Sequence, residues 1–214
     1  MADVKTDLSY EAAREANIKI GGTEEGRKVL SDEKVGKSVL DTFEEVEKLK
    51  SESMRDPLTG LYNYGFLMEE LEKRTENKDQ KLALISVDMD NFKNTNDTFG
   101  HEVGNSVIKG LARGLVNKIR INTDGFVARY GGDEFVILLP GYTDLKSLKL
   151  RGDEIREAVS GTDFRVGKRG IHQTVSVGVG LWNGEETARE FLERIDKAMY
   201  EAKNKGRDLV VEAK

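Results

Sequence analysis

The feature that most constrains the fold is a pair of apolar segments separated by two consecutive glycines. Residues 126–128 and 136–139 are apolar, and the glycine pair 131–132 stands between them. This arrangement is typical of a β-hairpin. Asp133 and Glu134 follow the glycines at once, and the aromatic Phe135 comes next. A plain turn needs no such carboxylates, so the sequence predicts that the turn presents charge to a ligand. A metal-bound phosphate suits carboxylates beside a bare backbone.

Length and composition predict a water-soluble protein with one main domain. The chain has 214 residues, of which 37% are hydrophobic and 34% are charged. A core of ordinary size can be buried within that length. No apolar run approaches the roughly 18 residues of a membrane span, and residues 1–5 lack the pattern of a signal peptide. We therefore expect a cytoplasmic protein that does not enter a membrane.

The side-chain inventory limits the chemistry. The chain has no cysteine and two histidines, His101 and His172. Disulfides, thiolate nucleophiles and cysteine-ligated zinc are thereby excluded. A metal site must use oxygen ligands, which favour Mg²⁺ or Mn²⁺. The net charge of −5 argues against a nucleic-acid partner, because nonspecific binding to phosphates depends on clustered Lys and Arg.

The first 55 residues differ in character from the rest. They are rich in charge and poor in aromatic residues, and Gly21 and Gly22 separate two helical segments. The composition changes at Asp56, where a Pro and a Gly follow within five residues. We therefore predict an N-terminal charged helical leader or linker over residues 1–55 and a catalytic domain over residues 56–214.

The second half of the leader carries a short apolar stripe. Val39, Phe43 and Val46 follow a 4-3 spacing, but the next two positions are Lys50 and Ser53. The pattern ends before the three or four heptads that a coiled coil needs. A solvated helix or mobile leader is one interpretation, and a dimerising helix is the other.

From residue 61 onward, helical and extended patterns alternate. Beside the hairpin, periodicity predicts strands at residues 82–87, 173–180 and 209–211, and helices at about 63–73, 105–120, 144–159 and 187–203. Strands that return through hairpins as well as helices indicate an α+β sheet rather than a purely parallel one.

Two aspartates follow the apolar strand at residues 82–87. Asp88 and Asp90 share one face if the strand continues through both. Either one then joins Asp133 or Glu134 around a cation. Metal-dependent phosphoryl and nucleotidyl transfer is built on acids of this kind. The alternative is that the two aspartates cap a loop.

Three basic residues indicate a function only when they are considered together with these acidic residues. Lys93 takes the sixth position of a segment that begins like an EF-hand, where glycine is required, and Phe99 takes the acidic twelfth position. The segment is therefore no calcium loop, and Lys93 is a loop lysine placed to reach phosphates. Lys203 and Arg207 lie near the end of the last helix. Alone, they complement the helix dipole.

Together these segments resemble the GGDEF family of diguanylate cyclases over residues 55–212. The motifs that carry the resemblance lie at residues 56–63, 88–97, 100–101, 129–135 and 198–207. Several motifs in the right order are far more specific than one. The resemblance implies a palm-type (ferredoxin-like) α+β domain, in which helices flank a mostly antiparallel central sheet. It also implies a nucleotidyltransferase that condenses two GTP into cyclic di-GMP and releases pyrophosphate.

The resemblance also assigns roles at the reacting centre. Asp88, the Met89 carbonyl and Asp133 are the implied ligands of Mg²⁺ or Mn²⁺, and Glu134 supports the metal site. Asp133 is the implied acceptor of the ribose 3′-hydroxyl proton. Lys93 is implied to stabilise charge on the transferred phosphate.

Further positions are implied to bind the substrate. Lys203 and Arg207 hold the terminal phosphates, and the two glycines of the hairpin permit close backbone approach. Asn96 and His101 are implied to lie in the base pocket. The complete set is Phe92, Asn96, His101, Asn105, Gly131, Gly132, Lys203 and Arg207. Because each domain presents one nucleotide, a homodimer is implied, and the leader helix is a candidate for promoting it.

The chain departs from the family pattern at two places. Asn105 stands where the family usually has an aspartate that accepts hydrogen bonds from guanine. Losing a charge-assisted bond costs on the order of 1.5 to 3 kcal/mol, and an amide also suits adenine. An Arg-x-x-Asp inhibitory site would occupy positions 122 and 125, but Asn122 and Gly125 stand there. We therefore expect weak product inhibition at that site.

Three functional interpretations follow. The chain is an active diguanylate cyclase, a degenerate domain that binds nucleotide for signalling, or a cyclase with relaxed base selectivity. Intact acids favour the first, and Asn105 keeps the others open.

Overall fold

The computed structural model describes residues 41–42, 45–46, 48–119, 125–167 and 169–214. The chain divides into two compact units, Met1–Met54 and Arg55–Lys214. In the first unit, the described residues between 41 and 53 are helical, and those before 41 lie outside the description. No helix in the described parts of the chain is both long and apolar enough to cross a membrane.

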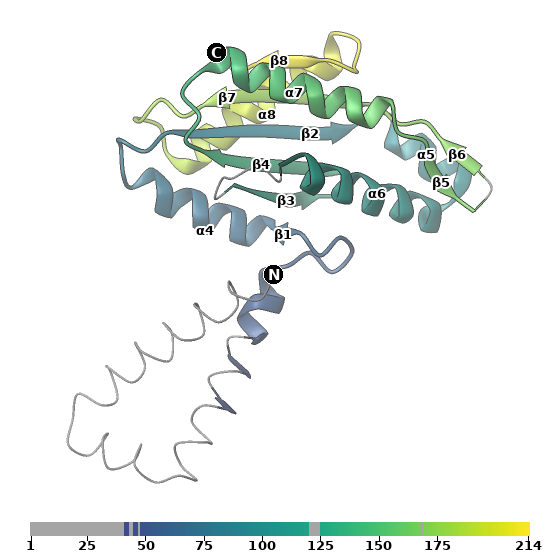
Figure 1. Cartoon of the computed structure of the whole chain (residues 1–214), viewed down its shortest axis with the longest axis horizontal. Helices are drawn as coiled ribbons and strands as arrows, with labels where there is room; N and C mark the ends of the chain where they lie inside the picture. The colour runs from purple at the N-terminus through teal and green to yellow at the C-terminus, as the bar shows by residue number, and fades with distance from the viewer. Residues whose placement is uncertain (1–40, 43–44, 47, 120–124, 168) are drawn as a thin grey trace. The chain divides into compact units, whose positions relative to one another are not determined.

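The second unit is built on a six-stranded sheet with the order β1-β3-β4-β2-β7-β8 (Figure 1). The three inner pairings are antiparallel, and the two outer pairings are parallel. A separate hairpin joins β5 and β6. In chain order the elements are β1 (Tyr62–Asn63), α4 (Tyr64–Thr75), β2 (Leu82–Met89), α5 (Phe92–Phe99), α6 (His101–Ile119), β3 (Phe126–Gly131), β4 (Glu134–Pro140), α7 (Leu145–Ser160), β5 (Phe164–Val166), β6 (Arg169–Ile171), β7 (Val175–Leu181), α8 (Ala188–Asn204) and β8 (Val210–Glu212). The mostly antiparallel α+β sheet flanked by helices is confirmed.

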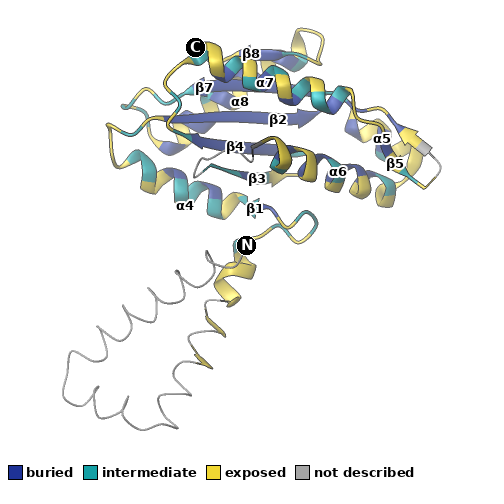
Figure 2. Cartoon of the chain, in the orientation of Figure 1, coloured by how far each residue is buried: buried dark blue, intermediate teal, exposed yellow. Residues whose placement is uncertain are grey.

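The central strand β2 separates two hydrophobic layers. All eight of its residues are buried, as Figure 2 shows for the middle of the sheet. Ile85 and Val87 belong to the cluster that includes the buried faces of α6 and α7. Leu82 and Leu84 belong to the cluster that includes α4 and α8. Alternate residues therefore bury opposite faces of the sheet, and β2 ends inside the protein.

In the second unit the predicted helices and strands are present, and their ends follow local signals; the helical segments predicted before residue 41 lie outside the described residues. Asp144 caps α7 by accepting from two main-chain N–H groups. Thr187 and Glu190 form a capping box at the start of α8. Helix α8 packs closely on β7, because a Cβ at Gly178 would lie 2.4 Å from the carbonyl oxygen of Ile195. This close approach seats the helix that carries Lys203.

The segment after β2 corrects one prediction. Lys93 was expected in a loop, but it lies in the helix α5. Asn91 enters this helix with a left-handed φ of 54°, and Phe92 and Thr95 are buried. Packing against the core thus overrides the low helix propensity of the Asn and Thr residues. The short strands β1, β5 and β6 were also not predicted, and α6 begins at His101 rather than at about residue 105.

Candidate active site

The end of β2 lies beside the turn of the β3–β4 hairpin. Asp88 and Glu134 are direct partners in the antiparallel register of β2 and β4, so their side chains share one face. The main-chain N–H of Met89 donates to the carbonyl oxygen of Asp133 at 3.4 Å. The sheet therefore brings together acidic residues that lie about 45 positions apart in the sequence.

Asp88 is buried and only partly compensated. Its side chain is 2% exposed, and Oδ2 accepts from Nζ of Lys203 at 2.5 Å. Oδ1 is buried with no hydrogen-bond partner. Burial raises the pKa of Asp88 to about 7, since repulsion from Asp133 and Glu134 adds to it and Lys203 offsets only part of it. A cation beside Oδ1 would relieve this cost.

Asp133 shares the same electrostatic environment. Burial raises the pKa of its carboxyl group, although its own backbone N–H, Lys203 and Arg129 act in the opposite direction. Glu134 is half-buried at the start of β4. Gly132 takes a left-handed φ of 49°, and no atom lies within 4 Å of where a Cβ on Gly131 would sit. The turn thus has open space beside its acids.

Arg129 fastens this turn to the beginning of the domain. Its Nε and one terminal nitrogen donate to the carbonyl oxygen of Gly132, at 3.0 and 2.5 Å. Its other terminal nitrogen donates to both carboxylate oxygens of Asp56, at 3.1 and 3.0 Å. Burial alone would raise the pKa of Asp56, but hydrogen bonds from Thr59 and Arg129 outweigh it and hold the pKa below its ordinary value. One guanidinium group therefore holds the turn in place.

Helix α8 and the turn that follows it supply the basic residues. Lys203 lies in its last turn, and its side chain is 26% exposed. Arg207 lies just beyond the helix, is exposed, and has a left-handed φ of 67°. A groove of about 580 Å³ beside the site is lined by Glu134, Asp196, Lys197, Met199, Tyr200, Glu201, Lys203 and Asn204. Acidic and basic groups thus face the same open space.

The expected base-binding residues lie on α5 and α6. Asn96 is half-buried on α5, and a Cβ on Gly104 would overlap its side-chain oxygen. His101 and Asn105 are exposed and four residues apart on α6, so they share a helix face. Phe92 is buried in the core, and its ring edge also approaches Gly104.

A comparison with known protein families identifies the family of this chain. The sequence profile described as "Diguanylate cyclase, GGDEF domain" matches residues 53–209. The chain belongs to the GGDEF family.

Curated relatives resemble this GGDEF domain over part of their length. The diguanylate cyclase DgcP of Pseudomonas aeruginosa is 36% identical over 166 residues, which are 76% of this chain and 24% of that protein. The response regulator PleD of Caulobacter vibrioides is 35% identical over 165 residues, which are 74% of this chain and 36% of that protein. The chain therefore spans between about a quarter and a little over a third of the length of these relatives.

Solved structures share the fold. The coiled coil and GGDEF domain of DgcB from Caulobacter crescentus, in complex with c-di-GMP, has a TM-score of 0.77 at 28% identity and covers 83% of this chain and 95% of that one. The diguanylate cyclase SiaD of Pseudomonas aeruginosa, in complex with its activator SiaC, has a TM-score of 0.71 at 33% identity and covers 97% of this chain and 81% of that one. The palm-type fold implied by the resemblance is confirmed.

Within the GGDEF domain, Asp88 and Asp90 at the end of β2 have different partners. Asp88 faces the hairpin acids. The carboxylate of Asp90 accepts from the hydroxyl groups of Thr174 and Ser176 and from the N–H of Asp208. Asp88 therefore joins the acidic site, and Asp90 holds the surrounding structure.

The bond between Arg129 and Asp56 could not be predicted from the sequence. Both residues stand in motifs that carry the family resemblance, but they are 73 positions apart. No local pattern pairs residues at that distance. Only the parallel pairing of β1 with β3 brings their segments together.

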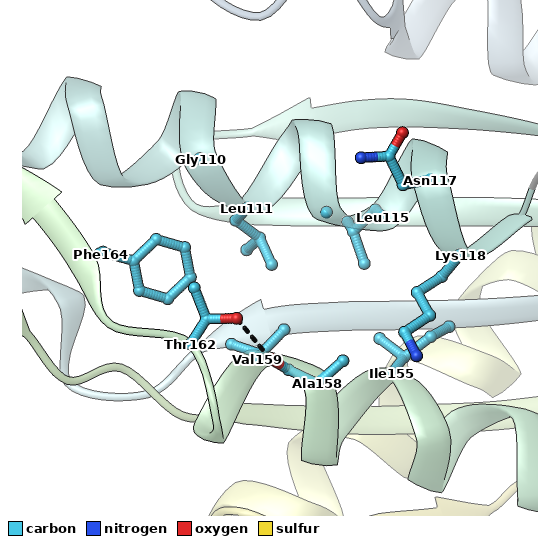
Figure 3. Close-up of a pocket in the computed structure, with 11 residues that line it drawn as sticks. Gly110, Leu111, Leu115, Asn117, Lys118, Ile155, Ala158, Val159, Thr162 and Phe164 are labelled. Carbon is cyan, nitrogen blue, oxygen red and sulfur yellow. Dashed lines mark hydrogen bonds between the residues drawn. The ribbon is translucent and has the colours of Figure 1, made fainter.

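A second cavity lies elsewhere in the GGDEF domain. A pocket of about 400 Å³ opens between α6 and α7, as Figure 3 shows. Its lining residues are Gly110, Leu111, Gly114, Leu115, Asn117, Lys118, Ile155, Ala158, Val159, Thr162 and Phe164. This lining contains no carboxylate, so the pocket does not belong to the acidic site.

The raised pKa of Asp88 predicts a pH dependence of stability for the metal-free chain. Below about pH 4 the carboxyl group is protonated in both the folded and unfolded states. Between about pH 4 and 7 the carboxyl group is ionised in the unfolded state and still protonated in the folded state. The stability that Asp88 contributes is therefore lost progressively as the pH rises from about 4 to 7. Asp88→Asn should remove that loss, so the free energy of unfolding of the variant should exceed that of the unmodified chain increasingly toward pH 7. Urea unfolding with a chelator, from about pH 4 to 8, measures the difference. Parallel pH profiles would contradict this assignment.

Proposed function

We propose that the chain is a diguanylate cyclase, which condenses two GTP into cyclic di-GMP and releases two pyrophosphates. The observation that carries the proposal is the carboxylate of Asp88, which is buried beside two further acids with one oxygen unpartnered. The GGDEF family match supports the reaction class. DgcP carries the name diguanylate cyclase, and the DgcB domain was solved with c-di-GMP bound.

A divalent cation fits these residues. Among the described residues, no three His, Cys, Asp or Glu side chains form a cluster that could hold an ion unaided. Mg²⁺ commonly uses one or two carboxylates together with substrate phosphates. Asp88, Asp133, the Met89 carbonyl and Glu134 would hold Mg²⁺ or Mn²⁺. The bound ion would neutralise charge on the phosphate and acidify the attacking hydroxyl.

The proton is accepted by Asp133. Its raised pKa makes it a stronger base than an exposed aspartate. In each of two steps the 3′-oxygen of one nucleotide loses its proton and forms a bond to the α-phosphorus of the other. The bond from that phosphorus to pyrophosphate breaks.

The basic residues bind the phosphates. The side chain of Lys203 is partly exposed, and its ammonium group forms an ion pair with Asp88. Together with Arg207, Lys203 would bind the β- and γ-phosphates. Lys93 is exposed at the start of α5, the helix that follows β2. It would stabilise charge on the transferred phosphate.

Each domain presents one nucleotide, so the reaction requires two domains face to face. A homodimer of the chain supplies them. The leader is a candidate for holding the pair together, because its described residues between 41 and 53 are helical. Weak product inhibition remains a prediction, since Asn122 lies outside the described residues.

The central test is turnover of GTP by the purified chain with Mg²⁺. Asp133→Ala should lower the rate of cyclic di-GMP formation by at least about 10²-fold, because a general base contributes 10²–10⁴-fold. Product identification by mass spectrometry measures it. Asp163→Asn is the matched control, because Asp163 is exposed and, within the described part of the chain, its one ion pair is with the exposed Arg165 on β5.

Two outcomes would contradict the proposal. Equal rates for Asp133→Ala and the unmodified chain would remove the hairpin acids from the chemistry. Tight binding of Mg²⁺ and GTP without any product would instead favour a degenerate, nucleotide-binding signalling domain.

Relaxed base selectivity is a second candidate property, and Asn105 favours it. This residue is exposed on the same face of α6 as His101, and it offers guanine an uncharged acceptor. We predict that Asn105→Asp raises the preference for GTP over ATP by about 10- to 100-fold, as a charge-assisted hydrogen bond would. Rates with each nucleotide alone and in competition measure this ratio. If the unmodified chain forms only cyclic di-GMP and ATP does not inhibit it, Asn105 recognises guanine through its amide oxygen.

A further inference from the structure

Asp90 is a buried carboxylate that the proposed chemistry does not use. It is 5% exposed. Its Oδ1 accepts from the hydroxyl of Ser176 at 2.6 Å, and its Oδ2 accepts from the hydroxyl of Thr174 at 2.7 Å. Oδ2 also accepts from the main-chain N–H of Asp208 at 3.0 Å. The two oxygens are therefore engaged by β7, by Thr174 just before it, and by the segment between α8 and β8.

That segment has an unusual backbone. Gly206, Arg207 and Asp208 follow one another with φ values of 120°, 67° and 46°. A left-handed conformation is unfavourable for an L-residue, and Asp tolerates it better than Arg. Such strain persists only where the surroundings enforce it, and it concentrates at functional sites.

The surroundings hold this turn at three points. The N–H of Arg207 donates to the carbonyl oxygen of Ala202 at 3.1 Å. Arg156 of α7 donates to the carboxylate of Asp208 at 3.0 Å. The third point is the bond from the N–H of Asp208 to Asp90, and it is the only one of the three made to a buried carboxylate.

We propose that Asp90 is a positioning residue, which fixes the left-handed turn so that Arg207 is presented to the terminal phosphates of GTP. The proposal rests on the proposed function in that Arg207 binds those phosphates. Asp88 then holds the end of α8 through the side chain of Lys203, and Asp90 holds the turn after it through the main chain of Asp208.

The physical gain is preorganisation. The Arg side chain is long and loses rotamer freedom when it binds. Fixing the main chain on both sides of Arg207 limits the volume that its guanidinium group must search. The main-chain group that the turn offers at Asp208 is an N–H, so an acceptor is needed to hold the backbone there. A buried carboxylate is the strongest acceptor available.

The test measures binding rather than turnover. Asp90→Ala should weaken binding of Mg²⁺ with a GTP analogue whose α,β-bridge is methylene by about 10-fold, as loss of a charge-assisted bond would. Binding of GMP, which lacks the β- and γ-phosphates, should change less than about 2-fold. Isothermal titration calorimetry on the full chain gives both affinities.

Two further variants separate positioning from stability. Asp90→Asn should keep most of the affinity, because its amide oxygen can accept from Asp208 while the hydroxyl of Ser176 turns to accept from the amide nitrogen. Ser176→Ala removes a donor from the same carboxylate but leaves the bond to Asp208. It should lower the free energy of unfolding and leave nucleotide affinity unchanged. If Asp90→Ala does not fold, Asp90→Glu serves in its place, since it keeps the charge and displaces the acceptor.

A double variant tests the link to Arg207. Asp90→Ala should cost little further affinity in an Arg207→Ala background, because neighbouring residues that act as one unit are not additive. Additive losses would overturn the proposal. So would an equal loss of affinity in Ser176→Ala, or an equal loss for GMP.

Amide hydrogen exchange separates this proposal from the proposed function. The N–H of Asp208 should exchange slowly in the unmodified chain and in Asp90→Asn, and faster in Asp90→Ala. Slow exchange that persists in Asp90→Ala would overturn the positioning contact itself. Failure of the unmodified chain to bind GTP would instead overturn the proposed function.

Discussion

The carboxylate of Asp88 is buried at the end of the central strand, and one lysine compensates only one of its oxygens. Burying an ionised group is costly unless it is paired and hydrogen-bonded. The fold creates this cost by ending β2 inside the protein beside a hairpin that carries two more acids. It limits the cost through Lys203 on the neighbouring helix. One oxygen of Asp88 is left without a donor, and a cation bound together with a triphosphate would use that oxygen.

The acidic turn and the basic helix end are each held by a bond from a distant part of the GGDEF domain. Arg129 ties the carbonyl oxygen of Gly132 to Asp56 at the start of the domain. Asp90 ties the main chain of Asp208 to the end of β2. The side chains that we propose as functional thus stand on segments whose backbones are fixed by residues elsewhere in the domain. Preorganisation of this kind lets charge be stabilised without rearrangement during the reaction.

Much of this fold could be predicted from sequence, because its main elements carry strong local signals. The hairpin, the apolar β2 and the capped helices α7 and α8 all follow from periodicity and end signals. Helix α5 could not be predicted, because tertiary packing of Phe92 and Thr95 outweighs its weak propensity. The short strands β1, β5 and β6 carry two or three residues each, too few for a pattern. Within the site, the resemblance to the GGDEF family pointed to Asp88, but alternation along the strand alone could not decide between Asp88 and Asp90. That decision depends on which partners the folded sheet places beside each carboxylate.

The central claim is that the free oxygen of Asp88 receives a cation that GTP shares. Titration with Mn²⁺ in the presence of the α,β-methylene analogue of GTP, followed by electron paramagnetic resonance, measures bound metal directly. The unmodified chain should bind Mn²⁺ together with the nucleotide, and Asp88→Asn should weaken that binding by about 10-fold or more, while Asp163→Asn binds normally. Equal binding of Mn²⁺ by the unmodified chain and by Asp88→Asn would contradict the account.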